Sequence, residues 1–129
     1  MTTDSNAENP RPQIDFAKMD GLLPAIVQDD STAQVLMLGF MNEASWQRTQ
    51  ETGFVTFWSR TRQKLWMKGE TSGNRLRIVD VATDCDQDTL LFRVEVEGDG
   101  LVCHEGTVSC FTRPLQIATT KTATSGDDK

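Results

Sequence analysis

The chain has 129 residues, of which 37% are hydrophobic, and a formal net charge of -6. This length supports one compact core but not two, and the acidic balance argues against broad binding to duplex nucleic acid or to an anionic membrane surface. No secretory signal, apolar spanning run or twin-arginine leader is recognisable, so we expect a cytoplasmic protein. We expect a single domain over residues 13–118, between a flexible polar arm (1–12) and a flexible polar tail (119–129).

The first predicted elements are a hairpin and a helix. Two short apolar runs, 23–27 and 35–40, flank an Asp-Asp-Ser turn and predict a β-hairpin. Asn42 can cap a helix over residues 43–51, and Gly53 can end it in the left-handed conformation. This is the clearest helix in the sequence.

Three further strands are predicted at residues 54–59, 76–82 and 89–97. The last of them alternates apolar and polar residues, which predicts one buried and one solvated face. A Gly-Asp-Gly turn at 98–100 then leads the chain into Leu101–His104. The predicted fold class is α+β, with a small mixed or antiparallel sheet, one clear helix and short additional helices.

The three cysteines of the chain, Cys85, Cys103 and Cys110, together with its single histidine, His104, indicate a transition-metal site. An odd number of cysteines disfavours an intramolecular disulfide framework, although ordinary buried thiols remain an alternative. Three thiolates with a vacant fourth position would suit a catalytic zinc, whereas adding the imidazole would give a closed structural site. In an extended segment Cys103 and His104 point to opposite sides, which favours the open site.

Three carboxylates surround the first cysteine at alternate positions: Asp84, Asp86 and Asp88 flank and follow Cys85. If this segment is extended, the carboxylates share one face and the thiol takes the other. Clustered carboxylates suit magnesium, calcium or manganese, while thiolates suit zinc. Since Cys85 precedes the last predicted strand and Cys103 follows it, we expect both to lie near the same edge of the sheet.

A basic segment at residues 60–77 carries a charge of +5, against -11 for the rest of the chain. Its cations are Arg60, Arg62, Lys64, Lys68, Arg75 and Arg77. A local cationic patch on an acidic protein suits a compact anion better than a long polyanion, although a solvated basic face is the alternative.

The mixture of cations, indole rings, hydroxyls and glycines at 57–74 suits a phosphorylated heterocycle. Cations would hold phosphates, Ser72 and Gly73 would offer donors, and Trp66 would stack on a ring, whereas Trp58 fits core packing better. The candidate substrate-binding residues are Ser59, Arg60, Arg62, Lys64, Trp66, Lys68, Ser72 and Gly73.

These stretches together resemble the phosphoribosyl-AMP cyclohydrolase family of histidine biosynthesis. The resemblance rests on the Ser-Arg segment with its lysines, the Asp-Cys-Asp-x-Asp row and the Cys-His-x-Gly-x-x-Ser-Cys-Phe loop, which follow one another in the family's order and spacing. The matching stretches are 21–28, 35–38, 41–42, 59–74, 83–91 and 103–111. The chain departs from common family residues at Thr61, Val102 and Glu105, none of which is a candidate ligand.

The resemblance implies an intertwined homodimer in which Cys85, Cys103 and Cys110, drawn from both subunits, bind zinc. It also implies magnesium at Asp84, Asp86 and Asp88. The implied reaction is hydrolytic opening of the adenine ring of 1-(5-phosphoribosyl)-AMP between N1 and C6, and neither nucleic acid nor membrane is an expected partner. Another chain must then supply the pyrophosphohydrolase step that makes the substrate.

We assign His104 as the proton acceptor of this reaction, because it is beside a ligand and because histidine is the residue type best suited to proton transfer near neutral pH. The alternative is that its ring merely bonds a backbone carbonyl. Two other functions stay open from the sequence: a zinc-stabilised module that binds single-stranded nucleic acid through the basic segment, and a structural metal domain without catalysis. Turnover of phosphoribosyl-AMP separates the enzyme from both.

Overall fold

The structure, a computed structural model, describes residues 14–118, so the expected arm (1–12) and tail (119–129) lie outside the described residues. The chain begins with a 3-10 helix, η1 (Phe16–Met19). It continues through β1 (Leu23–Asp29), β2 (Val35–Met41), α2 (Glu43–Thr52), β3 (Thr56–Ser59), β4 (Lys64–Met67), β5 (Leu76–Thr83) and β6 (Leu90–Val96). None of the helices within residues 14–118 is long and apolar enough to cross a membrane.

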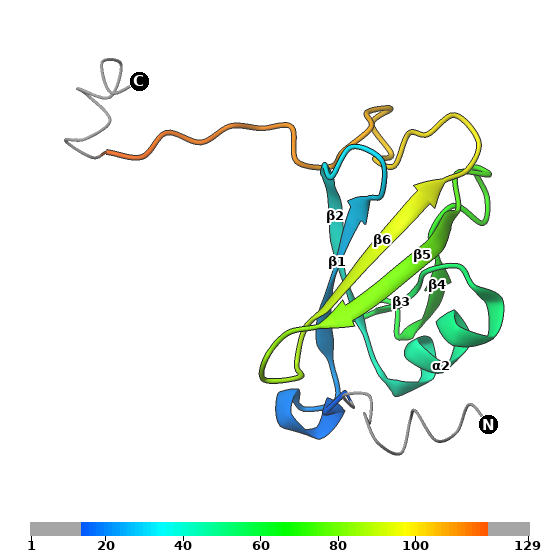
Figure 1. The fold of residues 1–129 in the computed structure, drawn as a ribbon, viewed down its shortest axis with the longest axis vertical. Coiled ribbons are helices and arrows are strands. Elements are labelled where there is room, and N and C mark those ends of the chain that lie inside the picture. Colours follow the sequence, from blue (N-terminus) through cyan, green and yellow to red (C-terminus); the bar gives the residue numbers. More distant parts are fainter. Residues whose placement is uncertain (1–13, 119–129) are drawn as a thin grey trace, which may run out of the picture.

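A four-stranded sheet in the order β2-β1-β6-β5 forms the frame of the molecule (Figure 1). β1 pairs with β2 in the predicted antiparallel hairpin and with β6 in parallel, while β5 and β6 are antiparallel. A second sheet is the β3–β4 hairpin, which lies beside α2. The mixed sheet with one α-helix and a short additional helix confirms the α+β prediction.

The core lies between the large sheet and the layer formed by α2 and the β3–β4 hairpin. Phe57 from β3 and Phe92 from β6 are fully buried there. β6 alternates as predicted: Leu90, Phe92 and Val94 are buried while Arg93 and Glu95 are exposed. Because apolar burial of this kind stabilises a side chain by about 2 kcal/mol, this alternation fixes the register of the strand.

The helix begins where the sequence predicts and runs one residue further, to Thr52, before the predicted stop at Gly53. Asn42 accepts a hydrogen bond from the Ser45 N–H at 2.9 Å, and the Ser45 hydroxyl accepts one from the Asn42 N–H at 2.9 Å, which completes a capping box. Gly53 ends the helix with φ of +80°. The buried Thr49 hydroxyl accepts from the Thr56 N–H at 2.9 Å, so the helix is tied directly to β3.

Two extended segments predicted from the sequence are turns in the structure. Residues 84–88 form the connection between β5 and β6, where Gln87 has φ of +64°, and residues 103–106 form a turn around Gly106, with φ of +85°. Strand alternation therefore does not place the Asp84–Asp88 carboxylates or separate Cys103 from His104. The short strand β4 was not predicted, because its three apolar residues lie between two lysines, Lys64 at its start and Lys68 just after its end.

Candidate active site

The acidic turn between β5 and β6 gathers three carboxylates. Asp84 Oδ1 accepts hydrogen bonds from the N–H groups of Asp88, at 3.0 Å, and Thr89, at 3.3 Å. The Gln87 N–H donates to the Asp84 carbonyl at 3.1 Å, which closes the turn. The chain thus curls so that ligand oxygens of Asp84, Asp86 and Asp88 all lie within 4.8 Å of one another. The predicted cluster exists, but a tight turn makes it rather than an extended strand.

The 3-10 helix η1 contacts this acidic turn. The Lys18 ammonium donates to the Asp86 carbonyl oxygen at 2.6 Å and lies 3.7 Å from an Asp88 carboxylate oxygen. The Asp15 N–H also donates to the Gln87 carbonyl at 3.0 Å. Lys18 was not predicted as part of this cluster, because nothing local in the sequence links it to the turn at 84–88.

The carboxylates of the acidic turn differ in acidity. Desolvation, followed by the charges of Asp86 and Asp84, raises the pKa of Asp88, and the nearby Lys18 only partly offsets this. Desolvation also opposes ionisation of Asp84, but hydrogen bonds, first from the Asp88 N–H, lower its pKa overall. Repulsion among three close carboxylates is the arrangement that a bound divalent cation relieves. The turn therefore fits a hard metal ion.

A second cluster forms where the chain turns after Leu101 and returns to β2. The Gly106 N–H donates to the Cys103 carbonyl at 2.9 Å, and the Cys103 N–H donates to the Thr107 carbonyl at 3.0 Å. The buried Ser109 hydroxyl donates to the Val35 carbonyl at 2.8 Å, and the Cys110 N–H donates to the Leu36 carbonyl at 2.8 Å. These bonds fold the segment back on itself and anchor its second cysteine against the first residues of β2.

Cys103 and Cys110 are close enough for each sulfur to affect the acidity of the other. A hydrogen bond from the Glu105 N–H lowers the pKa of Cys103, with further help from Thr107 and Cys110. Burial raises the pKa of Cys110, and the nearby Cys103 raises it further. One thiol of the pair is thus predisposed to ionise. A metal cation would favour the thiolate at both, so the pair fits two positions of a thiolate-bound metal.

Cys85 does not join this pair within one chain. It is exposed on the acidic turn before β6, whereas Cys103 and Cys110 follow β6 at the opposite end of the sheet (Figure 1). A strand rises about 3.3 Å per residue, so the seven residues of β6 separate the two ends by about 20 Å. The expectation that Cys85 and Cys103 lie near the same edge is wrong, because the 98–100 turn does not lead the chain back along β6.

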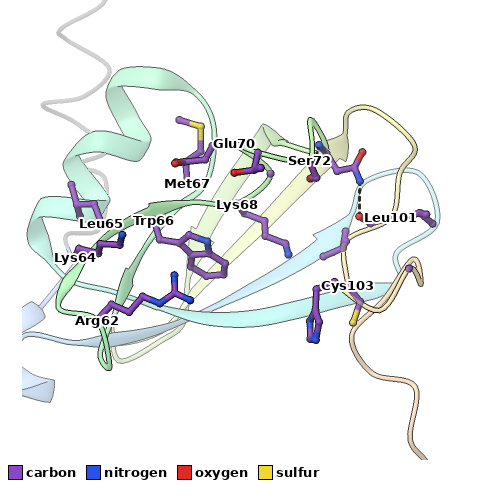
Figure 2. A pocket seen from close by; sticks show the side chains of 16 residues that line it. Arg62, Lys64, Leu65, Trp66, Met67, Lys68, Glu70, Ser72, Leu101 and Cys103 are labelled. Carbon is purple, nitrogen blue, oxygen red and sulfur yellow. Dashed lines mark hydrogen bonds between the residues drawn. The ribbon is translucent and has the colours of Figure 1, made fainter.

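An open cavity of about 630 Å³ lies between β4, the loop that follows it and the Cys103 turn. Figure 2 shows Trp66 and Lys68 on one wall and Cys103 on the opposite one. Candidate residues that line it are Arg62, Lys64, Trp66, Lys68, Ser72, Cys103 and His104. The Trp66 ring packs against Phe57, with ring centroids 5.2 Å apart, and the Lys68 ammonium lies 5.8 Å from the Trp66 ring centroid. Five of the eight predicted substrate-binding residues thus line the same cavity as the predicted catalytic histidine.

The other three predicted substrate-binding residues lie elsewhere. Ser59 lines a smaller adjoining cavity of about 250 Å³, which shares Arg62, Lys64 and Trp66 with the large one. Arg60 lies over the Phe40 ring, with its guanidinium carbon 4.3 Å from the ring centroid. Arg60 and Gly73 line neither cavity.

Sequence reasoning also missed residues of the cavity wall. Glu70, Thr71, Asn74 and Leu101 line the large cavity. Asn74 follows two turn-forming residues, Ser72 and Gly73. This position was the one feature of the sequence that could have indicated a structural role for Asn74. The two tryptophans also differ from expectation: Trp58 is half-buried and is not part of the core cluster, whereas Trp66 packs against that cluster and faces the cavity.

Comparison with known proteins identifies the family of this chain. A family model described as phosphoribosyl-AMP cyclohydrolase matches residues 37–112. The chain is 54% identical to the phosphoribosyl-AMP cyclohydrolase of Solibacter usitatus over 110 residues, covering 85% of this chain and 86% of the relative. It is 56% identical over 104 residues to the enzyme of that name from Desulfatibacillum aliphaticivorans, covering 81% and 82%.

A longer type of relative also matches. The histidine biosynthesis bifunctional protein HisIE of Vibrio cholerae is 56% identical over 104 residues, which cover 81% of this chain and 49% of that protein. The match of the family model, the high identity to relatives of similar length and the convergence of the predicted residues on one cavity lead to the same assignment. The chain belongs to the phosphoribosyl-AMP cyclohydrolase family, hydrolases of histidine biosynthesis.

Proposed function

We propose that this chain opens the adenine ring of 1-(5-phosphoribosyl)-AMP by hydrolysis of the N1–C6 bond. The observation that carries the proposal is the cavity in which Lys68 and Trp66 face Cys103 (Figure 2) and which His104 also lines. Substitution at N1 leaves the ring cationic and C6 electrophilic. Water oxygen adds at C6 and becomes the carboxamide oxygen, while N1 leaves with the bonding electron pair and gains a proton.

The substrate has two phosphates, and two adjoining cavities suit them. Arg62 and Lys64 line both cavities, so a phosphate in either cavity would lie beside them. Lys68 and Ser72 line only the large cavity and would hold the other phosphate. Charge-assisted hydrogen bonds of this kind fix the ends of the substrate and so orient the ring between them.

His104 is the proposed proton acceptor for the attacking water. It lines the large cavity, is exposed and directly follows Cys103. Within residues 14–118 no hydrogen bond engages its imidazole, which leaves both ring nitrogens available for proton transfer. This favours the catalytic role over the alternative in which the ring only bonds a backbone carbonyl.

Cys103 and Cys110 would hold zinc together with Cys85 of a second subunit, and Asp84, Asp86 and Asp88 would hold magnesium. Zinc at this position would supply Lewis acidity that makes water a better nucleophile. The lowered pKa of Cys103 supports the first assignment and the close carboxylates support the second. A cytoplasmic location would keep these thiols reduced.

A homodimer would unite the separated cysteines. Because each chain has an exposed Cys85 at one end of its sheet and the Cys103–Cys110 pair at the other, two antiparallel copies can complete two sites. Exposed apolar side chains beyond the pair, Leu115 at 90% and Ile117 at 71%, are typical of a surface that a partner covers.

The test is turnover of 1-(5-phosphoribosyl)-AMP, followed by the absorbance change on ring opening, before and after treatment with a chelator. We expect turnover by the purified chain, its loss on chelation, and recovery with zinc and magnesium. Binding to single-stranded oligonucleotides without turnover would contradict the proposal and favour the nucleic-acid-binding alternative. Absence of both turnover and oligonucleotide binding would favour a structural metal domain.

A further inference from the structure

Asn74 joins the two walls of the large cavity. Its side chain is buried, with 8% of the residue exposed, and it lies between the loop after β4 and the start of β5. The Asn74 Nδ2 group donates to the Leu101 carbonyl at 3.0 Å, the dashed bond that ends at Leu101 in Figure 2, and its Oδ1 accepts from the Asp99 N–H at 2.8 Å. Among the described residues these two bonds are the only hydrogen bonds between segments 68–74 and 98–104.

Gly98 allows the second segment to approach Asn74 this closely, and Gly69 allows the first segment to fold tightly around it. A Cβ atom at Gly98 would lie 2.1 Å from Asn74 Oδ1, and one at Gly69 would lie 2.3 Å from the Asn74 backbone carbonyl. Both glycines also have positive φ, of +70° and +84°. A side chain at Gly98 would therefore push the second segment away from Asn74, whereas one at Gly69 would disturb the turn of the first segment that holds Asn74.

The two segments carry different parts of the proposed chemistry. The first holds Lys68 and Ser72, which would bind a phosphate. The second runs from Asp99 through Leu101 directly into Cys103 and His104. The distance between the phosphate and the proton acceptor therefore depends on the contact at Asn74, together with the neighbouring bond from the Glu97 N–H to the Arg75 carbonyl at 2.9 Å.

We infer that Asn74 is a positioning residue of this enzyme. Its amide sets the separation between the wall that binds the substrate and the wall that carries the reactive groups, without contacting the reacting atoms. This inference rests on the proposed function for its chemical meaning. Displacing a reacting group by about 1 Å typically costs about a hundredfold in rate, so a small change in this contact has a measurable effect.

The test compares Asn74→Ala and Asn74→Asp with a matched control, Asn42→Ala. Asn42 is also a hydrogen-bonded asparagine at an element boundary, but it caps α2 and lines neither cavity. Asn74→Asp keeps the size and the acceptor of the side chain, removes the donor to Leu101 and places a negative charge opposite that carbonyl, so it breaks this bond without the cavity that alanine would leave. The measurements are kcat and KM for 1-(5-phosphoribosyl)-AMP, the urea midpoint, and hydrogen–deuterium exchange of peptides covering residues 98–104.

We expect both Asn74 variants to lower kcat at least about tenfold and to speed exchange at 98–104, while Asn42→Ala lowers only the urea midpoint. Values of kcat within about twofold of the unmodified chain, with a lowered urea midpoint, would reduce Asn74 to a stabilising residue and overturn the inference. Unchanged exchange at 98–104 would overturn it independently of any activity. No turnover by the unmodified chain would instead refute the proposed function.

Discussion

The two ends of the large sheet carry two candidate metal clusters that are assembled in different ways. At one end, a single turn of five residues supplies three carboxylates within 4.8 Å of one another. At the other end, Cys103 and Cys110 meet only because the segment after Leu101 folds back onto β2, and the third thiol lies on the acidic turn itself. A local cluster is complete within one chain, whereas a cluster built from distant segments needs the tertiary fold and, as we propose, a second subunit.

The largest expected effect comes from the cysteines. If the proposed zinc site exists, changing Cys85, Cys103 or Cys110 to serine should remove the metal and lower turnover at least about a hundredfold, because zinc would supply the activation of water. The measurement is zinc per chain by elemental analysis together with turnover. Zinc retained in all three variants would contradict the ligand assignment.

Mixing two inactive variants tests whether cysteines at opposite ends of the sheet bind one metal across two subunits. In a dimer of one Cys85→Ser chain and one Cys103→Ser chain, one site has all its cysteines and the other lacks two. Random pairing makes half of the dimers mixed, so refolding the variants together should restore about a quarter of the normal activity. A mixture as inactive as its components would show that the three thiols do not bind across subunits.

Changing His104 to alanine should lower turnover about a hundredfold while zinc content and the urea midpoint stay unchanged. The physical reason is that an exposed imidazole in the cavity stabilises little, whereas loss of the proton acceptor raises the barrier for water attack. Full activity in this variant would exclude His104 from the reaction.

Changing Asp86 to asparagine tests the local cluster by itself. We expect zinc content to stay the same and the magnesium concentration for half-maximal activity to rise about tenfold, because one hard anionic ligand is lost. Asp80→Asn is the matched control, since its exposed carboxylate pairs with Arg93 on the neighbouring strand and lies outside the cluster. An equal shift in both variants would indicate a general charge effect.

The smallest effect concerns Asp29, which closes the β1–β2 hairpin away from both clusters. Its carboxylate accepts hydrogen bonds from the Ser31 hydroxyl at 2.7 Å and the Thr32 N–H at 2.9 Å, and the Ser31 bond is the main cause of its lowered pKa. Since the folded pKa lies below the unfolded value near 3.8, this stabilisation is present above that pH and is lost as the pH falls through the folded pKa.

Asp29→Ala should therefore lower the free energy of unfolding by about 1 kcal/mol at neutral pH. The difference from the unmodified chain should shrink below pH 4, because protonation removes the same hydrogen-bond acceptor. Urea unfolding at pH 7 and pH 3 measures both values, and a difference that is independent of pH would contradict the role of the ionised carboxylate. The substitution should leave the metal content of the protein unchanged.

Local features of the sequence predicted most of the secondary structure. Asn42 and Gly53 marked the ends of α2 because capping is decided by a few neighbouring residues. The alternation in β6 predicted its buried face, since side chains on a strand point to opposite sides. β4 escaped prediction, because Lys64 and Lys68 leave only a short apolar centre between them.

The candidate site was predicted as a set of residues but not as a geometry. Lys68, Trp66 and His104 were identified from residue type and from the resemblance to a family, and they do line one cavity. Strand alternation gave the wrong reason for the carboxylate cluster, because the chain turns at Gln87 instead of continuing extended. Asn74 and Lys18 were missed, since their roles depend on contacts with segments distant in the sequence.

The sequence by itself thus determined the chemical inventory of this protein: soft and hard metal ligands, cations and a single imidazole in the order of one family. Only the tertiary structure decided which of these groups meet. It brought Cys103 and His104 to face Lys68 and left Cys85 at the far end of the sheet. The physical reason is that residue type fixes what a side chain can bind, whereas the strand register and the turns fix where it points.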